Sequence, residues 1–154
     1  MRWDQGRAGI DRMLADAELQ RVPPSREQAD SLIAQARIHL TSATSICDQD
    51  PPGAYALVYD AARKALTAVL ENQGLRPTTR GGHLATYDAV RAQLDPPLGK
   101  ILRPFDRMRR QRHDAEYPPA DTPPLTTGDV HEDIPKAIEI ITMSERVLDQ
   151  MSPY

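Results

Sequence analysis

Prolines divide this chain of 154 residues into segments of helical length, and they constrain its fold more than any other feature. A proline inside a helix removes a hydrogen bond and clashes with the preceding turn, so helices are expected to start or stop there. Between the prolines the apolar residues recur with a helical period, and no segment alternates strictly as a half-buried strand would. The pattern predicts an all-α fold. The boundary prolines are Pro23, Pro24, Pro51, Pro52, Pro77, Pro96, Pro97, Pro118, Pro119, Pro123 and Pro124.

Local signals place the helix ends. Ser25 and Gln28 form a capping-box pair at the start of the second segment, and Gly74 is a natural cap at the end of the third. The fifth segment stops before Pro118, because a residue that precedes proline leaves the helical region. Pro135 is expected to kink or delay the last helix. The expected helices span residues 3–19, 25–47, 52–73, 82–94, 97–116 and 128–151, with a proline-rich loop at 118–128.

Four of these segments are long and amphipathic, so they can close an up-and-down four-helix bundle through short connections. The other two segments, residues 3–19 and 82–94, are expected to be accessory helices. The predicted division places an N-terminal accessory helix and linker at residues 1–24, and the helical bundle at residues 25–151.

The composition favours a cytoplasmic protein without a membrane span. No run of about 18 apolar residues occurs, so no transmembrane span is expected, and the N-terminus lacks the apolar part of a signal peptide. The single cysteine, Cys47, cannot form an internal disulfide, which favours a reducing cytoplasm. Cys47 lies in phase with Leu40 and Ala43, a position that predicts a buried structural thiol rather than a nucleophile.

Arginine is concentrated in one helix. Five arginines fall between residues 103 and 112, in a chain whose net charge is −3. Residues 100–113 carry six Lys and Arg against one Asp, whereas residues 114–154 carry nine Asp and Glu against two Lys and Arg. This segregation favours complementary surfaces or a basic cleft that faces an anion, with a solvated helix face as the alternative.

One of these arginines is predicted to lie on the buried side of its own helix. At about 100° per residue, Arg112 continues an apolar stripe and Glu116 follows one turn later. A guanidinium and a carboxylate on a core-facing line are costly unless they are paired or used. Arg107 is expected on the solvent side, about 200° from Phe105, with His113 at the edge of the stripe. The stripe consists of Leu98, Ile101, Leu102, Phe105 and Met108.

Two sequence segments together resemble a known family. Residues 55–66 read Tyr-Ala-Leu-Val-Tyr-Asp-Ala-Ala-Arg-Lys-Ala-Leu, and residues 112–117 read Arg-His-Asp-Ala-Glu-Tyr. The pairing resembles the HEPN superfamily, and in particular actinobacterial HEPN proteins of toxin–antitoxin type, over roughly residues 25–151. The resemblance implies an all-α four-helix bundle, usually dimeric, that in many members is a metal-independent RNase.

The resemblance also implies site residues. The family motif is an arginine, a polar neighbour, three variable residues and a histidine; Arg112 and His113 match its start, and Tyr117 occupies the histidine position. In active members, residues of two protomers form a composite site in which arginine holds the scissile phosphate and histidine supports proton transfer at the 2′-hydroxyl. Arg109 and Glu116 are assigned to substrate binding. Because a tyrosine hydroxyl is a poor base near neutral pH, weak cleavage or none is expected.

Other features leave alternatives open. Arg107 and His113 give a looser match to the motif, but on a helix they cannot share a face. If the helix frays before Pro118, His113 could still turn into the cleft, so the sequence leaves open whether His113 or Tyr117 faces it. The glycines before His83 can expose backbone amides to an anion, or form an ordinary flexible entry to a helix. The rings of Tyr55, Tyr59 and Tyr87 are in phase with aliphatic residues and are expected in the core.

No metal or cofactor is expected. The chain lacks a P-loop, a nucleophile elbow and a dinucleotide fingerprint. Its histidines show no spacing typical of zinc ligands. They are His39, His83, His113 and His131.

The sequence therefore predicts a cytoplasmic bacterial HEPN-like homodimer that presents Arg112 in a basic cleft to RNA or a nucleotide. A nucleotidyltransferase-type antitoxin or another protein is expected as partner, and no membrane. The alternative is a non-catalytic interaction module, an adaptor or antitoxin-like regulator that kept the bundle and lost the base. A third hypothesis is that the pair of Arg112 and Glu116 only fixes the register of a helical core.

Overall fold

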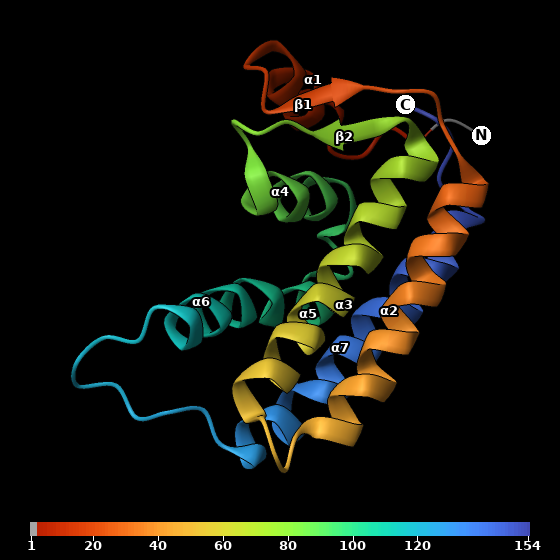
Figure 1. Cartoon of the computed structure of the whole chain (residues 1–154). Helices are drawn as coiled ribbons and strands as arrows, with labels where there is room; N and C mark the ends of the chain where they lie inside the picture. Colours follow the sequence, from red (N-terminus) through yellow and green to blue (C-terminus); the bar gives the residue numbers. More distant parts are fainter. Residues whose placement is uncertain (1–2) are drawn as a thin grey trace.

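The computed structural model describes residues 3–154, and most of them are helical (Figure 1). The all-α prediction is confirmed. The strands of the described residues form a single short antiparallel pair. In chain order the elements are α1 (Arg7–Ala15), β1 (Leu19–Arg21), α2 (Arg26–Ile46), α3 (Pro51–Gln73), β2 (Leu75–Pro77), α4 (Gly82–Leu94), α5 (Gly99–Leu102), α6 (Pro104–Glu116) and α7 (Thr127–Leu148).

The three longest helices form the body of the molecule. Helix α3 packs along both α2 and α7, and its apolar residues are buried from end to end. Helix α6 contacts α3 and then leans away from it, as the teal helix of Figure 1 shows. Helix α4 packs against the upper end of α3, and α1 packs against α4. The predicted bundle is therefore present, with accessory helices, and its fourth helix projects from the other three.

The predicted helix ends at Ser25 and Gly74 are observed, but only half of the predicted capping box forms, because the Ser25 amide donates to the Glu71 carbonyl instead. The Ser25 hydroxyl accepts a hydrogen bond of 3.0 Å from the Gln28 amide, and Gly74 ends α3 in the left-handed conformation with φ of 81°. Thr126 and Asp129 form a reciprocal capping box at the start of α7. This second N-terminal signal was not predicted from the sequence. This box starts α7 ahead of Pro135, so the proline does not delay the helix.

Two predicted helices have different extents in the structure. The segment at 97–116 is divided into α5 and α6, because Pro104 has no amide to donate and takes the first position of a new helix. The segment at 3–19 yields only α1, and Ala17 turns the chain with a positive φ of 59°. Residues 19–21 then pair with residues 75–77, a contact between distant segments that local periodicity does not reveal.

The N-terminal segment packs on the rest of the chain. Helix α1 lies against α4, and Ile10 and Leu19 are part of the single core. The amide of Trp3 donates to the Ser152 hydroxyl at 2.9 Å, so the two described ends of the chain lie close together (Figure 1). No helix in residues 3–154 has the length and apolarity required to cross a bilayer.

Candidate anion-binding site

A pocket of about 280 Å³ opens between α3, the start of α4 and α6. It brings together three of the residues assigned from the sequence, Arg109, Arg112 and His113, with a histidine from a different helix. The pocket is lined by Tyr59, Gly81, His83, Leu84, Arg109, Arg112 and His113.

Arg112 holds the position of the key arginine, but it is not buried. Its guanidinium lies 2.8 Å from the Glu116 carboxylate, which confirms the predicted pair, and its side chain remains 36% exposed. The predicted burial is wrong because α6 leans away from α3: only Phe105 and Met108 of this helix are fully buried. Arg112 therefore faces the pocket, with its guanidinium carbon 6.0 Å from the centre of the Tyr59 ring.

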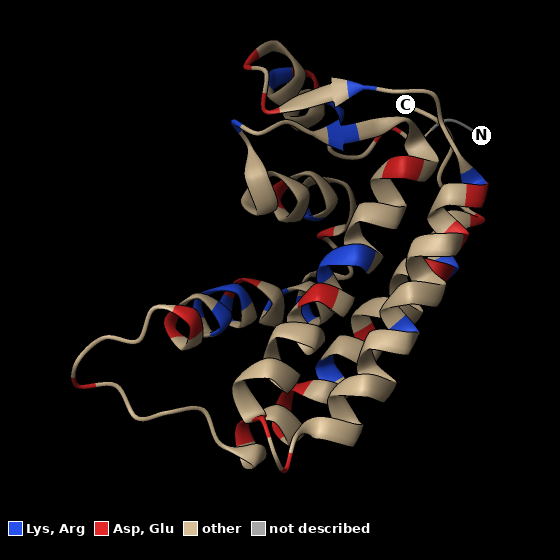
Figure 2. Cartoon of the chain, in the orientation of Figure 1, with Lys and Arg blue, Asp and Glu red and all other residues tan. Residues whose placement is uncertain are grey.

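The basic residues of α6 are only partly neutralised. Arg109 and Arg110 share one carboxylate, that of Asp106, at 3.0 and 3.4 Å. Figure 2 shows Lys and Arg gathered along α6. Because these ion pairs are partly exposed, each stabilises the fold only slightly and can exchange for another anion. The pocket is thus a region of positive charge in an acidic chain.

His113 and Tyr117 have different environments. His113 lines the pocket, whereas Tyr117 is the C-terminal cap of α6 and is 64% exposed. Their ring centres lie 5.2 Å apart, so Tyr117 packs against His113 and does not itself line the pocket. Glu116 is exposed and engages Arg112. Of the two residues that the motif proposed for proton transfer, the structure puts His113 in the pocket.

A tyrosine–histidine pair was missed by the sequence analysis. The hydroxyl of Tyr59 and Nδ1 of His83 lie 2.8 Å apart. Burial lowers the pKa of His83, with a further contribution from Arg63, so the imidazole is neutral at pH 7. Burial raises the pKa of Tyr59 to about 12 and keeps its hydroxyl protonated. With Nδ1 occupied by Tyr59, Nε2 is the nitrogen that a ligand in the pocket can reach.

The two glycines before His83 position it. A Cβ at Gly81 would lie 2.5 Å from the backbone oxygen of Glu18, and Gly82 has a positive φ of 61°. Both positions therefore require glycine for backbone reasons. In the sequence, these two glycines were the one feature that pointed to the start of α4, where His83 lies.

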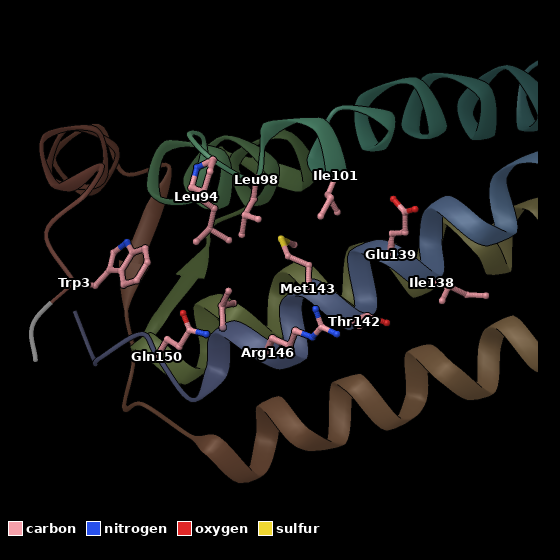
Figure 3. A pocket seen from close by; sticks show the side chains of 12 residues that line it. Trp3, Leu94, Leu98, Ile101, Ile138, Glu139, Thr142, Met143, Arg146 and Gln150 are labelled. Carbon is pink, nitrogen blue, oxygen red and sulfur yellow. The ribbon is translucent and has the colours of Figure 1, made fainter.

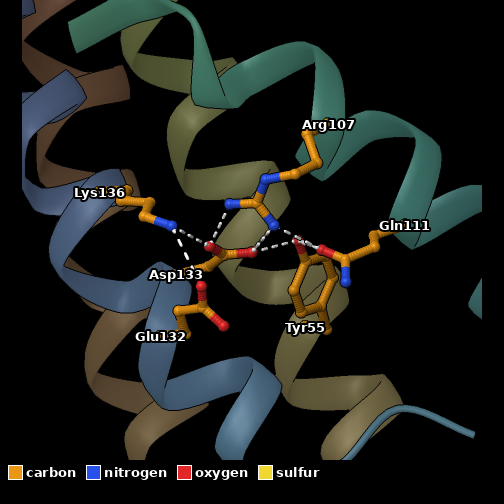
Figure 4. Close-up of polar contacts among 6 residues, drawn as sticks. All are labelled: Tyr55, Arg107, Gln111, Glu132, Asp133 and Lys136. Carbon is orange, nitrogen blue, oxygen red and sulfur yellow. Dashed lines mark hydrogen bonds and ion pairs between the residues drawn. The ribbon is translucent and has the colours of Figure 1, made fainter. Parts of the chain in front are cut away.

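Arg107 belongs to a different cluster. Its side chain is 40% exposed, but it is directed toward α7 and not into open solvent as predicted. Its guanidinium meets Asp133 of α7, with Nη1 3.0 Å from Oδ2 and Nη2 bonded to Oδ1 (Figure 4). Gln111 and the Tyr55 hydroxyl complete the cluster, the latter 2.6 Å from Oδ2. A helix projection finds one apolar stripe and treats the remaining surface as solvent-facing. In the structure α6 contacts two helices, α3 on one side and α7 on another. Arg107 lies on the flank that α7 covers.

The Asp133 carboxylate is charged although only 1% of its side chain is exposed. Burial alone would raise its pKa, but hydrogen bonds from Arg107 and Tyr55 outweigh that effect, and the pKa lies below its ordinary value. This pair joins α6 to α7, so it can fix how helices pack. Arg112 and Glu116 belong to one helix, four residues apart, and cannot fix the packing between helices.

The three tyrosines are core residues, as predicted. Tyr55, Tyr59 and Tyr87 are buried. Phe105 stacks between Tyr59 and Tyr87, with ring centres 5.4 and 5.5 Å apart. The stack therefore packs the first turn of α6, which carries Phe105, against α3 and α4.

A second cavity is apolar. A groove of about 460 Å³ lies between α7 and the segment from α4 to α5, with Leu98, Ile101 and Met143 pointing into it (Figure 3).

Cys47 is buried, as predicted. Among residues 3–154, the one group of three potential metal ligands consists of Cys47, Asp48 and His131.

Comparison with known proteins identifies the family. The chain gave no match among the curated proteins or the solved structures. Residues 25–147, which include α2 to α6 and nearly all of α7, match the HEPN domain family. The match covers most of the chain and coincides with the segment in which the resemblance was found. This protein therefore belongs to the HEPN domain family.

Proposed function

We propose that the pocket between α3, α4 and α6 binds the phosphate backbone of RNA. The observation that carries the proposal is the convergence of Arg109, Arg112, His83 and His113 on one open pocket. A guanidinium suits this role because its planar fork gives phosphate two parallel hydrogen bonds and keeps its charge at any physiological pH. Glu116 holds Arg112 in place until a phosphate displaces it, since an exposed ion pair is readily exchanged.

The same pocket has groups for a metal-independent cleavage. In the tautomer whose Nδ1–H donates to the Tyr59 oxygen, Nε2 of the neutral His83 is unprotonated. Nε2 accepts the proton of a ribose 2′-hydroxyl, and the 2′-oxygen attacks phosphorus. The bond from phosphorus to the 5′-oxygen breaks, and His113, as general acid, gives that oxygen its proton. The products are a 2′,3′-cyclic phosphate and a 5′-hydroxyl. Because these residues come from one chain, the reaction does not require a histidine from a second protomer. We expect the rate to be low, since Tyr117 occupies the motif position of histidine.

The biological setting follows from the family resemblance. We propose a cytoplasmic bacterial protein that acts as a homodimer in a toxin–antitoxin or stress-response system, with a nucleotidyltransferase-type antitoxin as partner. A second function, a catalytically inactive adaptor that binds a partner protein, is favoured by the exposed Tyr117. Growth arrest on induction, compared between the wild type and Arg112→Ala, separates a toxin from an adaptor.

Binding of a labelled single-stranded RNA, followed by fluorescence anisotropy, tests the site. Arg112→Ala should weaken binding by about tenfold, as expected for loss of one charge-assisted hydrogen bond. Arg110→Ala is the matched control, because Arg110 carries the same charge on the same helix but does not line the pocket. Affinity should also fall with salt, because phosphate contacts release counterions. Equal losses in the two variants would show that the arginines act only as diffuse charge, and would contradict a defined site.

A further inference from the structure

The residues at the far end of α2 form a cluster of different chemistry from the arginine pocket. Cys47 caps the C-terminus of α2, and its Sγ lies 3.7 Å from Nε2 of His131 and 3.9 Å from Oδ1 of Asp48. The three ligand atoms all lie within 4.8 Å of one another. Cys47 is buried, while Asp48 and His131 are exposed and free to adjust. None of them lines the arginine pocket.

We infer that Cys47, Asp48 and His131 bind a zinc ion. Bond lengths of about 2.3 Å to sulfur and about 2.0 Å to nitrogen place neighbouring ligands of a tetrahedral zinc about 3.5 Å apart. The two distances measured from Sγ are within a few tenths of an ångström of that spacing. A thiolate with an imidazole selects zinc and related transition ions over magnesium and calcium, which prefer oxygen ligands. With three protein ligands, the fourth position is open to water.

The surroundings favour a cation. The ligands come from two segments, residues 38–62 and 113–135, and neither contains a lysine or an arginine. The C-terminus of α2, a helix of 21 residues, carries the negative end of its dipole to the site. The opposing positive end of α7 carries an acidic residue, Asp129, in its first turn. On binding, the Cys47 thiol gives its proton to solvent and the thiolate coordinates the metal. Its weak contact with the Thr44 carbonyl, at 3.4 Å, is then lost.

The site joins two parts of the chain that are distant in sequence. The Thr127 hydroxyl already donates to the Cys47 carbonyl at 3.1 Å, so the first turn of α7 is docked on the end of α2. A zinc ion would bind the same two elements together just after the proline-rich loop. Histidine spacing did not indicate this site, because Cys47 and His131 are 84 positions apart and only the fold brings them together.

The test uses the full chain after removal of metals with EDTA. Zinc is titrated against a chromophoric chelator, and cobalt is added separately as a spectroscopic probe. We expect one zinc per chain, a thiolate-to-cobalt charge-transfer band with the visible bands of tetrahedral cobalt, and a rise in Tm with zinc but not with magnesium. Asp48→Asn and His131→Ala alter exposed side chains, so both variants should fold. His131→Ala should raise the zinc Kd at least about tenfold, so the charge-transfer band should be lost at cobalt concentrations that just saturate the wild type.

The control is His39→Ala, which removes a histidine of α2 that is not in the cluster. It should bind zinc like the wild type. Three results would overturn the inference: no binding at micromolar zinc, equal displacement by magnesium, or binding that His131→Ala and Asp48→Asn leave unchanged. Alkylation of Cys47 adds an independent readout, because bound zinc should slow it in the wild type and not in His131→Ala.

Discussion

Arg107 on α6 and Asp133 on α7 form a forked ion pair in which the carboxylate is buried and the guanidinium reaches the surface. The pair holds the projecting helix α6 against the body of the protein. Tyr55 of α3 bonds to the same carboxylate, so one side chain connects three helices. The arginine pocket lies on another flank of α6, and its shape depends on this attachment.

Removal of Arg107 should destabilise the fold. Arg107→Ala leaves the Asp133 carboxylate buried, with Lys136 at 3.3 Å as its only remaining ion-pair partner in the described chain. We expect the free energy of unfolding in urea to fall by about 2–3 kcal/mol, since breaking a buried pair costs more than the pair contributes. Arg110→Ala should change it by less than about 0.5 kcal/mol. Similar losses in both variants would mean that the forked pair has no special structural role.

Asp133 should make the protein sensitive to acid. Its pKa is lowered in the folded state, so its contribution to stability is present above its unfolded pKa, near 4, and is lost as the pH falls through the folded pKa. Urea unfolding between pH 5 and pH 2, roughly the range over which such a carboxylate titrates, measures the effect. The stability difference between the wild type and Asp133→Asn should shrink as the pH falls. Asp114→Asn, at an exposed position, should follow the wild type.

Two histidines should reduce stability under mildly acidic conditions. Burial lowers the folded pKa of His83 and of His39, so below pH 6.5 the unfolded chain binds more protons than the folded one. Stability should therefore decline as the pH falls from 6.5 through the folded pKa values. The double variant His39→Gln and His83→Gln should show a flatter profile in that window. An unchanged slope would show that neither imidazole is kept neutral by the fold.

Cleavage assays in EDTA should distinguish the three candidates for proton transfer. RNA ends should be 2′,3′-cyclic phosphates, and His83→Gln and His113→Ala should each lower the rate by roughly 10² or more, as for a positioned acid or base. Tyr59→Phe should shift the pH profile with a smaller loss. Because Tyr117 is exposed, Tyr117→Phe should have little effect. Tyr117→His raises activity only if the end of α6 rearranges to bring residue 117 into the pocket.

The apolar groove predicts how two copies associate. Ile138 on α7 is 45% exposed beside the groove, and Glu139 and Arg146 lie on the same helix without an ion-pair partner in residues 3–154. An antiparallel contact of α7 with its copy across a two-fold axis would bring these opposite charges together. Light scattering at tens of micromolar should give a dimer for the wild type. Glu139→Arg and Arg146→Glu should each favour the monomer, and the double variant should restore the dimer; a monomeric wild type would rule this contact out.

Much of the helical framework could be predicted from the sequence, because its signals are local. Ser25 begins a helix and Gly74 ends one through bonds to residues within a turn, and the periodicity of α3 marks its buried face over many residues. The pair of Arg112 and Glu116 was predictable for the same reason, since a helix always brings residues four apart onto one side. The motif likewise predicted a site on α6, where Arg109, Arg112 and His113 line a pocket.

The tertiary structure decided everything that depends on which elements meet. Arg107 faces outward on an isolated helix, and only the position of α7 brings the buried carboxylate of Asp133 to that side. His83 reaches the pocket because α4 packs beside α6. Cys47 meets His131 because the C-terminus of α2 lies against the N-terminal turns of α7. Side-chain spacing specifies the faces of a helix, but packing between distant segments determines which of those faces is covered and what covers it.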